Sequence, residues 1–360
     1  MTGKIKTLGN TYSFEEIKRG DWDTEESAYL KEALSFCQDW LSGQNLFELH
    51  TSGSTGAPKP IQVERDKMEK SAQMTGEFLK LENQPKLLCC LNTAMIAGKM
   101  MLVRGMVWES ELHIVSPSSL FPARLPHTDY DLVAMVPMQV EKALRFKERG
   151  RVLGNTKNFL IGGAPSSERL REELRSWSGN FFQTFGMTET VSHIALADLK
   201  SKGPLIYKTL PGVDIDADAS GRLYVKSPTG IQSGFLTNDI VELTGKNEFI
   251  WKGRFDFVIN SGGYKIFVEE LEREIEPVWQ QYLPVNRFII TKASDELLGE
   301  KVILIFEGKL STQDLSKCMA ALKSKLHPYK YPKEVLQVDE FCTTPSGKIN
   351  RVKTTEKLKL

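Results

Sequence analysis

A segment rich in glycine and hydroxyl side chains is the first feature of the sequence that could do chemistry. It reads TSGSTGAPK and runs from Thr51 to Lys59. Glycines let a backbone curl around an anion, and exposed N–H groups and hydroxyls can then hold phosphate oxygens, with Lys59 adding positive charge. The spacing is not that of a Walker P-loop, because no Gly-Lys-Ser/Thr follows the glycines. A flexible Ser/Gly linker explains the composition equally well, but the strand-like residues 61–63 that follow argue against a mere linker.

A second segment, QTFGMTET at residues 183–190, follows directly after a predicted strand. Ligands of open α/β sheets usually bind where the strands end. A carboxylate beside a hydroxyl suits a phosphate with its Mg²⁺, so Glu189 would hold the cation and Thr188 would bond a phosphate oxygen. The alternative is a strand-to-helix turn in which Thr188 caps the helix.

Two later segments combine glycines with charged residues. Residues 253–266 read GRFDFVINSGGYKI, and residues 345–351 read PSGKINR. Taken singly, an arginine beside an aspartate could be a surface ion pair, two glycines could form an ordinary hairpin, and a lysine in a glycine turn is usually solvated. Each segment alone is therefore a weak signal, and the argument depends on the order and spacing of all four.

The elements that must position these segments alternate between apolar strands and helices from about residue 87. We expect strands at 87–91, 111–115, 131–136, 158–161 and 181–184, and helices at 99–108, 138–147 and 167–177. Strands and helices that alternate in this way predict an α/β sheet with helices packed against it.

The remainder of the chain has a different pattern. Residues 203–255 contain glycines, prolines and short alternating segments, which predict β-hairpins or a small barrel. From residue 256 the pattern is α+β, with helices expected at 268–276 and 312–326 and strands at 287–291 and 302–306. We therefore predict an α/β protein with a large N-terminal domain at 1–255, which includes the β-rich subdomain, and a small C-terminal α+β domain at 256–360.

The composition excludes several classes of protein. The formal net charge of the 360 residues is +1, so no overall field would recruit nucleic acid or an acidic membrane. We find no apolar run of about 18 residues and no signal peptide, and therefore expect no integral membrane segment. The five cysteines are scattered and form no CxxC pair, which argues against a disulfide framework or a zinc site. A reducing, cytoplasmic location fits all of these features.

Together the segments resemble the adenylate-forming family of acyl- and aryl-CoA synthetases, firefly luciferase and peptide-synthetase adenylation domains. That family has a TSGTTGxPK loop, here TSGSTGAPK, and a YGxTE motif, here FGMTE at 185–189. Its GELxVKGP-like strand, TGD segment, GRxDxxIxxxG motif and PxxxxGKxxR motif are matched at 221–228, 237–239, 253–263 and 343–351. All occur in the order of the family, and the resemblance extends from about residue 48 to residue 351.

The resemblance implies a role for each matched residue. The loop would hold the β- and γ-phosphates of ATP through Thr51, Ser52, Gly53, Ser54, Thr55, Gly56 and Lys59. The adenine pocket would be lined by Gly162, Gly163, Ala164, Pro165, Thr184, Phe185 and Gly186. Thr188 would contact the α-phosphate, and Glu189 would bind Mg²⁺. Asp239 would accept hydrogen bonds from the ribose hydroxyls with help from Arg254, and Lys348 would reach both the acid's carboxylate and the α-phosphate.

The resemblance also implies a reaction in two steps, in which ATP activates a small carboxylic acid as an acyl-adenylate and coenzyme A then takes the acyl group. In this family the C-terminal domain is mobile and swings between the steps. Asp256 lies at the hinge position, and Gly262, Gly263 and Tyr264 would lie beside the pantetheine tunnel. Two alternatives remain open: an enzyme that loads a separate carrier protein, and a non-catalytic nucleotide-binding module. The presence of both Glu189 and Lys348 argues against the second.

Within the family, the o-succinylbenzoate–CoA ligases of menaquinone synthesis look most similar. The FGMTET segment matches their YGMTET version apart from Phe185, residues 135–140 are similar to their Val-Pro-Thr-Gln-Leu segment, and the chain is short, as theirs tend to be. Only about 50 residues precede the phosphate loop, where the family usually has well over 100. We therefore expect part of the N-terminal subdomain to be absent, which leaves the dimer interface, and so a homodimer, open.

The acid site would lie at Met95, Ile96 and Gly98, where the family has a His-Ile-Ser-Gly-like segment and this chain has Met95 in place of the histidine. A substrate with two carboxylates needs a cation for the one that does not react. The candidates are Lys99, Arg104 and His193, although each one taken singly is more often a solvated or ion-paired side chain. We favour His193, which would lie about one helical turn after Glu189. An apolar pocket without such a cation would instead favour another aryl- or acyl-CoA synthetase, acting on a simple aryl or fatty acid.

Overall fold

The computed structural model describes residues 2–23, 25–50, 60–118, 129–145, 154–231, 233–343 and 349–358. The glycine-rich segment 51–59 and Lys348 lie outside these residues. In the part described, no helix is both long enough and apolar enough to cross a membrane.

One long sheet runs through the N-terminal part. Its strands lie in the order β12-β13-β14-β15-β11-β10-β9-β8-β7-β5-β6-β1-β2. The section from β9 to β1 is parallel. Its strands are β1 (Lys4–Lys6), β5 (Lys86–Cys89), β6 (Glu111–Ile114), β7 (Leu132–Met135), β8 (Asn158–Ile161) and β9 (Asn180–Gly186). This confirms the predicted α/β fold and its apolar strands, which read as continuous apolar runs because both faces of the sheet are covered.

Helices cover the two faces of this parallel section, because successive side chains on a strand point to opposite faces. Leu87 and Cys89 pack into a core with residues of the helices α2 (Ala28–Leu41), α3 (Arg65–Leu79) and α4 (Ile96–Val107). Leu88 and Cys90 pack into a second core with residues of α5 (Pro137–Leu144) and α7 (Glu168–Leu174). At the N-terminus, β2 (Thr11–Ser13) and α1 (Phe14–Arg19) close the edge of the sheet. A separate hairpin consists of β3 (Leu46–His50) and β4 (Pro60–Glu64).

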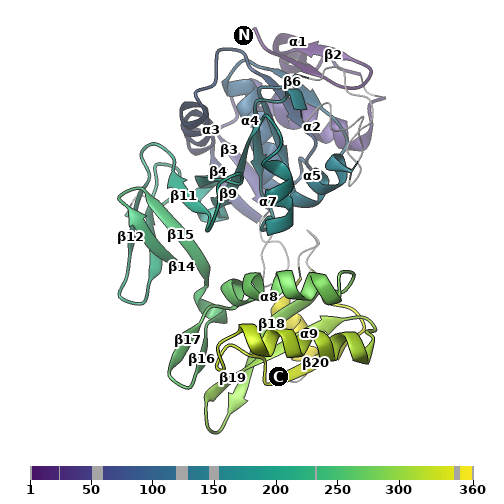
Figure 1. The fold of residues 1–360 in the computed structure, drawn as a ribbon. Coiled ribbons are helices and arrows are strands. Elements are labelled where there is room, and N and C mark those ends of the chain that lie inside the picture. The colour runs from purple at the N-terminus through teal and green to yellow at the C-terminus, as the bar shows by residue number, and fades with distance from the viewer. Residues whose placement is uncertain are drawn as a thin grey trace.

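The β-rich region continues the same sheet with antiparallel strands. They are β10 (His193–Asp198), β11 (Ile206–Thr209), β12 (Asp214–Ala217), β13 (Arg222–Lys226), β14 (Phe235–Gly245) and β15 (Glu248–Arg254). The predicted hairpins are present, but the alternative of a small barrel is wrong, since β12 forms an open edge. Figure 1 shows β12, β14 and β15 projecting to one side of the helix-covered part.

The C-terminal elements form their own sheet and their own core (Figure 1). After the short 3₁₀ helix η2 (Phe255–Phe257) come β16 (Ile259–Ser261), β17 (Tyr264–Ile266), α8 (Val268–Tyr282), β18 (Phe288–Asp295), β19 (Gly299–Glu307), α9 (Thr312–Lys325), β20 (Glu334–Val338) and α10 (Arg351–Lys357). Residues from Ile259 to Leu326 make a hydrophobic cluster with no member from the large sheet. The domain boundary near residue 255 stays a prediction.

Helix α8 extends past the expected end at residue 276 and contains Pro277. Proline normally ends a helix because its ring and missing N–H disturb the preceding turn. Here Trp279 is fully buried in the C-terminal core, and its Nε1 donates a hydrogen bond to the Asn286 carbonyl at 2.7 Å. Burial of this side chain, of the order of 2–3 kcal/mol, offsets much of the cost of the proline.

Candidate active site

The ends of β8 and β9 bring the first two predicted adenine-site segments together. The strands are parallel neighbours, with Ile161 paired to Gln183. A Cβ added at Gly162 would lie 2.5 Å from the Thr184 hydroxyl oxygen, so the two residues touch. Gly163, next in the turn, has a φ of +83°, a conformation that L side chains rarely adopt. Gly162, Gly163 and Thr184 therefore lie at one carboxyl-terminal edge, as expected.

Phe185 is held by two other aromatic rings. Its ring meets Tyr207 and Phe249 edge-on, with centroids 5.6 and 5.1 Å apart. Tyr207 and Phe249 are stacked on each other at 5.3 Å. Such contacts fix the orientation of a ring, so Phe185 is well placed to present an apolar surface at the end of β9.

The segment after Phe185 does not enter an α-helix. Thr188–Thr190 forms a single 3₁₀ turn, η1, which Met187 precedes. The alternative in which Thr188 caps a helix is therefore wrong. Val191 has φ +65° and ψ −52°, and Ser192 N–H donates to the Thr190 carbonyl at 2.7 Å, which closes a tight three-residue turn. A β-branched residue in this conformation is a genuine outlier that surrounding contacts must stabilise.

The contacts that hold this turn come from a residue that the sequence did not single out. The hydroxyl of Thr229 donates to the Thr190 carbonyl at 2.9 Å and lies 2.8 Å from the Ser227 hydroxyl. A Cβ added at Gly230 would lie 3.3 Å from the Glu189 carbonyl oxygen. The segment that follows β13 thus supports the backbone of the Thr188–Glu189 pair. In the sequence, the only indication of a role for Thr229 and Gly230 is that they directly follow the matched motif at 221–228.

Glu189 is exposed, and its carboxylate makes no hydrogen bond or ion pair to the rest of the described chain. The Thr188 hydroxyl beside it is likewise unbonded within those residues. No cluster of three or more His, Cys, Asp or Glu that could hold a metal occurs in the described segments. The single carboxylate of Glu189 with the hydroxyl of Thr188 fits Mg²⁺, which is commonly bound through one or two carboxylates together with waters and substrate phosphates.

Asp239 and Arg254 are paired across the β14–β15 hairpin. The Asp239 carboxylate accepts a hydrogen bond from Trp251 Nε1 at 2.8 Å, and Arg254 Nη1 lies 3.8 Å from its other oxygen. The pKa of Asp239 is raised above its ordinary value, chiefly by burial and also by the negative charges of Asp256 and Glu189. The hydrogen bond from Trp251 and the charge of Arg254 act in the opposite direction. The charge of Glu189, which belongs to the other predicted site segment, is thus among those that act on Asp239. Sequence analysis did not identify Trp251, because its contact with Asp239 depends on the register of β14 and β15.

The predicted hinge residue Asp256 lies in η2, directly after β15. Its carboxylate accepts hydrogen bonds from Arg254 Nη2 at 3.1 Å and from Asn238 Nδ2 at 3.3 Å. Arg254 thus bridges Asp239 and Asp256. The same side chain therefore belongs both to the predicted ribose site and to the connection to the C-terminal elements.

The two lysine-bearing loops can be located only by their ends. His50 and Pro60, on either side of the segment 51–59, are paired in the β3–β4 hairpin. Ile349, directly after Lys348, is bridged to Thr343. Two residues later, the guanidinium of Arg351 binds both carboxylate oxygens of Glu272 at 2.7 and 2.5 Å. The roles of Lys59 and Lys348 stay predictions.

The predicted acid-site residues lie where α4 begins. Met95 precedes the helix without a capping hydrogen bond, and Ile96 is its first residue. Gly98 is buried against the backbone of Asn92, where a Cβ would lie 2.3 Å from the carbonyl oxygen. Lys99, on the next position, has its ammonium 5.6 Å from the centre of the Phe36 ring and 3.4 Å from the Glu48 carbonyl.

His193 begins β10 and pairs with Gly186, so the expectation that it lies one helical turn from Glu189 is wrong. Its Nδ1 faces Arg104 Nη2 at 3.5 Å, and its Nε2 lies 3.1 Å from the Thr75 hydroxyl. Arginine has only donors, so Nδ1 accepts and the proton is assigned to Nε2. Burial and the charge of Arg104 hold the pKa of His193 well below its ordinary value. A neutral imidazole is poorly suited to bind a carboxylate as a cation.

The positive charge beside His193 belongs to Arg104. It is 2% exposed, and burial lowers its pKa to about 10, so the guanidinium is protonated at neutral pH. It donates to the Ser192 hydroxyl at 3.2 Å and approaches the Met101 sulfur at 3.7 Å, whereas its Nε has no partner. No carboxylate forms an ion pair with it within the described segments. Buried charges are normally paired, so Arg104 is an unbalanced cation next to the end of β9.

The predicted CoA residues form the β16–β17 turn in the C-terminal sheet. Gly262 and Gly263 have φ values of +56° and +82°. Gly262 lies against Tyr329, whose ring would be 2.3 Å from an added Cβ, and Tyr264 stacks on the same ring at 4.6 Å. Among the described contacts, none joins these residues to Thr188 or Glu189, so the structure does not bring this group into the site formed by β8, β9 and β14.

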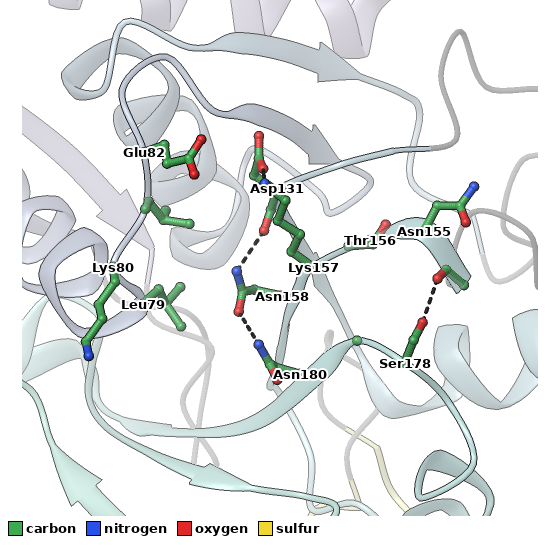
Figure 2. A pocket seen from close by; sticks show the side chains of 13 residues that line it. Leu79, Lys80, Glu82, Asp131, Asn155, Thr156, Lys157, Asn158, Ser178 and Asn180 are labelled. Atoms are coloured by element: carbon green, nitrogen blue, oxygen red, sulfur yellow. Dashed lines mark hydrogen bonds and ion pairs between the residues drawn. The ribbon is translucent and has the colours of Figure 1, made fainter.

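A pocket at the opposite edge of the sheet is separate from these residues. It lies at the amino ends of β7, β8 and β9, and Figure 2 shows Asp131, Asn158 and Asn180 joined in a row by hydrogen bonds. Asn180 Nδ2 donates to the Asn158 side chain at 3.1 Å, and Asn158 Nδ2 donates to the Asp131 carbonyl at 3.0 Å. These amides are satisfied by their neighbours, and no predicted site residue lines the pocket.

Comparison with known proteins agrees with the geometry. The family model described as AMP-binding enzyme matches residues 8–233. An acyl-CoA synthetase (AMP-forming)/AMP-acid ligase II-like protein from Dyadobacter fermentans is 37% identical, with a TM-score of 0.64, and the match covers 96% of this chain and 99% of that chain. The 2-succinylbenzoate–CoA ligase of Listeria monocytogenes is 24% identical over 97% of this chain and 76% of its own.

The o-succinylbenzoate CoA synthetase of Bacillus subtilis, solved with its acyl-adenylate intermediate, shares the fold. It has a TM-score of 0.70 at 22% identity, and the match covers 85% of this chain and 68% of that chain. The family model covers more than half of the residues, and the Dyadobacter match spans nearly the whole of both chains. The protein is therefore a member of the AMP-binding enzyme family.

Proposed function

We propose that this protein is an ATP-dependent acid–CoA ligase that forms an acyl-adenylate and then passes the acyl group to CoA. The observation that carries the proposal is the Asp239 carboxylate, which faces Arg254 at 3.8 Å and feels the charge of Glu189, a carboxylate without a partner among the described residues. A nucleotide needs both groups, one for its metal-bound phosphates and one for its ribose. The names of the Dyadobacter and Listeria relatives support the same reaction class.

In the first step, a carboxylate oxygen of the acid attacks the α-phosphorus of ATP, and the bond to the bridging oxygen breaks so that pyrophosphate leaves. The carboxylate and the triphosphate have the same sign of charge, so fixed positive charge and hydrogen-bond donors must offset their repulsion. Mg²⁺ held by Glu189 would supply part of this charge, and Lys348 would supply more. The Thr188 hydroxyl would donate to an α-phosphate oxygen.

Asp239 would hold the nucleotide by its ribose. A carboxylate has about four lone-pair sites, of which Trp251 occupies one on Oδ1. The remaining sites can accept hydrogen bonds from the two ribose hydroxyls. In the second step, the CoA thiolate attacks the acyl carbon of the mixed anhydride, and AMP leaves.

The acid that we propose is o-succinylbenzoate, an aromatic acid with a second carboxylate. Arg104 supports this choice, because a buried guanidinium that has no counter-ion among the described residues favours an anionic ligand. It lies beside Ser192 and His193, which directly follow the η1 turn that carries Glu189. Arg104 therefore replaces His193 as the cation that we assign to the second carboxylate. The Listeria and Bacillus relatives bear the name of this activity.

The test is AMP release from ATP and Mg²⁺ with o-succinylbenzoate, with and without CoA, in wild-type protein and in Lys348→Ala. Removal of one preorganised charge of this kind typically costs on the order of 100- to 1000-fold in rate. Lys353→Ala, an exposed lysine on α10, serves as the matched control and should keep full activity.

Three outcomes separate the possibilities. AMP release that depends on CoA and is lost only in Lys348→Ala supports the ligase and its substrate together. Turnover with benzoate or fatty acids but not with o-succinylbenzoate would retain the reaction and refute the acid. ATP binding without turnover of any acid, and with no effect of Lys348→Ala, would refute the enzyme.

A further inference from the structure

The side chain of Gln183 is fully bonded to the backbone turn that follows β8. Its Nε2 donates to the carbonyls of Ile161 and Ala164, at 3.1 Å each, and its Oε1 accepts from the Ser166 N–H at 3.0 Å and the Ser166 hydroxyl at 2.7 Å. The residue is 4% exposed. A glutamine amide has two donor hydrogens and two acceptor lone pairs. All four are used here, and all four partners belong to the same turn.

We propose that Gln183 is a positioning residue that fixes the 161–166 turn in the shape that faces the adenine of ATP. The inference rests on the proposed nucleotide site, since Gly162 and Gly163 lie within this turn. Because the amide has no free donor or acceptor, Gln183 acts on the nucleotide through the turn and makes no hydrogen bond to the base.

The turn needs these hydrogen bonds because its own backbone can adopt many conformations. Two successive glycines carry a large conformational entropy, which must be overcome to hold one shape. Strand β8 ends at Ile161, so the Ala164 carbonyl and the Ser166 N–H come after the sheet ladder, and backbone groups of this kind need other hydrogen-bond partners. Gln183 bonds both of them from the neighbouring strand, and it also bonds the Ile161 carbonyl at the end of β8. One side chain thereby fixes both ends of the turn relative to β9.

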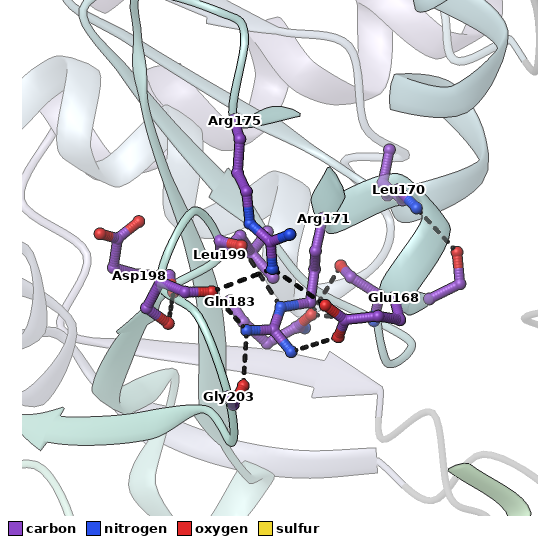
Figure 3. Close-up of polar contacts among 11 residues, drawn as sticks. Glu168, Leu170, Arg171, Arg175, Gln183, Asp198, Leu199 and Gly203 are labelled. Carbon is purple, nitrogen blue, oxygen red and sulfur yellow. Dashed lines mark hydrogen bonds and ion pairs between the residues drawn. The ribbon is translucent and has the colours of Figure 1, made fainter. Parts of the chain in front are cut away.

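Helix α7, which follows the turn, is fixed independently. The hydroxyl of Ser167 caps its first turn by accepting from Leu170 N–H at 3.2 Å. Arg171 then donates to the carbonyls of Ser201 and Gly203, at 2.8 and 2.9 Å, and to Glu168. Figure 3 shows Gln183 and Arg171 among these contacts. The turn therefore spans two anchored elements, and its shape depends on the bonds that Gln183 makes between them.

The experiment compares ATP binding by calorimetry in wild-type protein and in Gln183→Met, which keeps the length of the side chain and removes its hydrogen bonds. We expect binding about 10-fold weaker or more, because loss of buried polar partners of this kind typically costs one or more kcal/mol, with the KM of the acid unchanged. Asn158→Leu is the matched control, since Asn158 is a similarly buried amide at the other end of β8 (Figure 2). It should bind ATP as the wild type does.

Purine riboside triphosphate, which lacks the exocyclic amine of ATP, separates positioning from direct contact. Gln183→Met should weaken the binding of both nucleotides by the same factor. A penalty for ATP alone would show that the amide reads the base and would overturn the proposal. Hydrogen exchange of the amides at 161–166, measured without nucleotide, should be faster in Gln183→Met than in the wild type.

Ser166→Ala provides a second variant should Gln183→Met fail to fold, because it removes one hydrogen bond to the same amide. It should give a smaller loss of ATP affinity in the same direction. Unchanged ATP affinity in a folded Gln183→Met protein would refute the role of Gln183 and leave the ligase proposal intact. A wild-type protein that binds no ATP would refute both.

Discussion

Replacement of Arg104 by methionine should stabilise the fold while it impairs the use of an acid with two carboxylates. The two effects have opposite signs because they have one cause, a guanidinium that is buried without a counter-ion in the part of the chain that the structure describes. In the free protein the charge is unfavourable. In the complex it would meet the carboxylate that does not react. Methionine has a similar length and apolar bulk and removes the charge.

The magnitude follows from the displaced pKa. Burial lowers the pKa of Arg104 from its ordinary value of 12.5 to about 10. At about 1.4 kcal/mol per pH unit, this corresponds to a cost of about 3 kcal/mol for the buried charge. The unfolded chain holds this proton more tightly, so the cost is fully present below pH 10 and is relieved as the pH rises toward 12.5. The lost bonds to Ser192 and to His193 Nδ1 together offset about 1–2 kcal/mol, so Arg104→Met should gain about 1–2 kcal/mol.

The activity should change in the other direction. Truncation of one partner of a buried, hydrogen-bonded charge pair costs about 2–5 kcal/mol, so kcat/KM for o-succinylbenzoate should fall on the order of 100-fold or more. A monocarboxylate such as benzoate should lose little. Arg104→Lys keeps the charge and should lie between the wild type and Arg104→Met in both measurements.

The assay pairs urea unfolding at pH 7.5 with AMP release from each acid. Arg171→Met is the matched control, because Arg171 is equally buried but is bonded to Glu168 and to backbone carbonyls. That variant leaves its partners unsatisfied and should lose about 2–4 kcal/mol. The reasoning fails if Arg104→Met is destabilised like Arg171→Met, or if it impairs both acids equally.

Three further predictions follow from single contacts. Burial and the charge of Arg104 hold the pKa of His193 well below its ordinary value, so below about pH 6.5 only the unfolded chain binds this proton, and the free energy of unfolding should fall by up to about 1.4 kcal/mol per pH unit. Urea unfolding measured across pH should show a shallower fall of this free energy in His193→Gln, and an unchanged pH dependence would contradict the assignment. Asp239→Asn should raise the KM for ATP about 10- to 100-fold, roughly 1.4–3 kcal/mol, without a change for the acid, and equal effects on both would place Asp239 outside the ribose site. A Cβ at Gly186 would lie 2.3 Å from His193 Cα, so Gly186→Ala should lose at least about 1–3 kcal/mol in thermal unfolding, whereas Gly9→Ala, with open space around it, should not.

The sequence predicts best those elements whose type follows from the burial pattern of their own residues alone. Strands such as 158–161 are covered on both faces, so their continuous apolar runs identify them without knowledge of their neighbours. The edge at which we propose that adenine binds follows from these strands, because parallel neighbours end at the same edge of a sheet. The meeting of Gly162 with Thr184 was therefore predictable to the level of residues.

The path between Glu189 and His193 was not predictable in this way. His193 follows Glu189 by four positions, which is the spacing of one helical turn, and none of residues 190–192 is a glycine that would indicate a reversal. The left-handed Val191 is stabilised by tertiary contacts: β10 pairs with β9, and Thr229 bonds the Thr190 carbonyl. Such contacts depend on strand register and on a segment some 40 residues away, which periodicity does not report.

The same reason explains why the sequence assigns no role to the residues that support the predicted site, whereas it assigns one to each residue that matches a family motif. Thr229 holds the Glu189 turn, Trp251 donates to Asp239, and Gln183 holds the glycine turn. Each acts on a backbone or a carboxylate, and none has a side chain that is itself reactive. Positioning and electrostatic stabilisation supply most of the rate in phosphoryl and acyl-phosphate chemistry. A displacement of about 1 Å can cost on the order of 100-fold, so substitutions at these supports should lower activity through geometry, and their effects should shrink when the nucleotide is saturating.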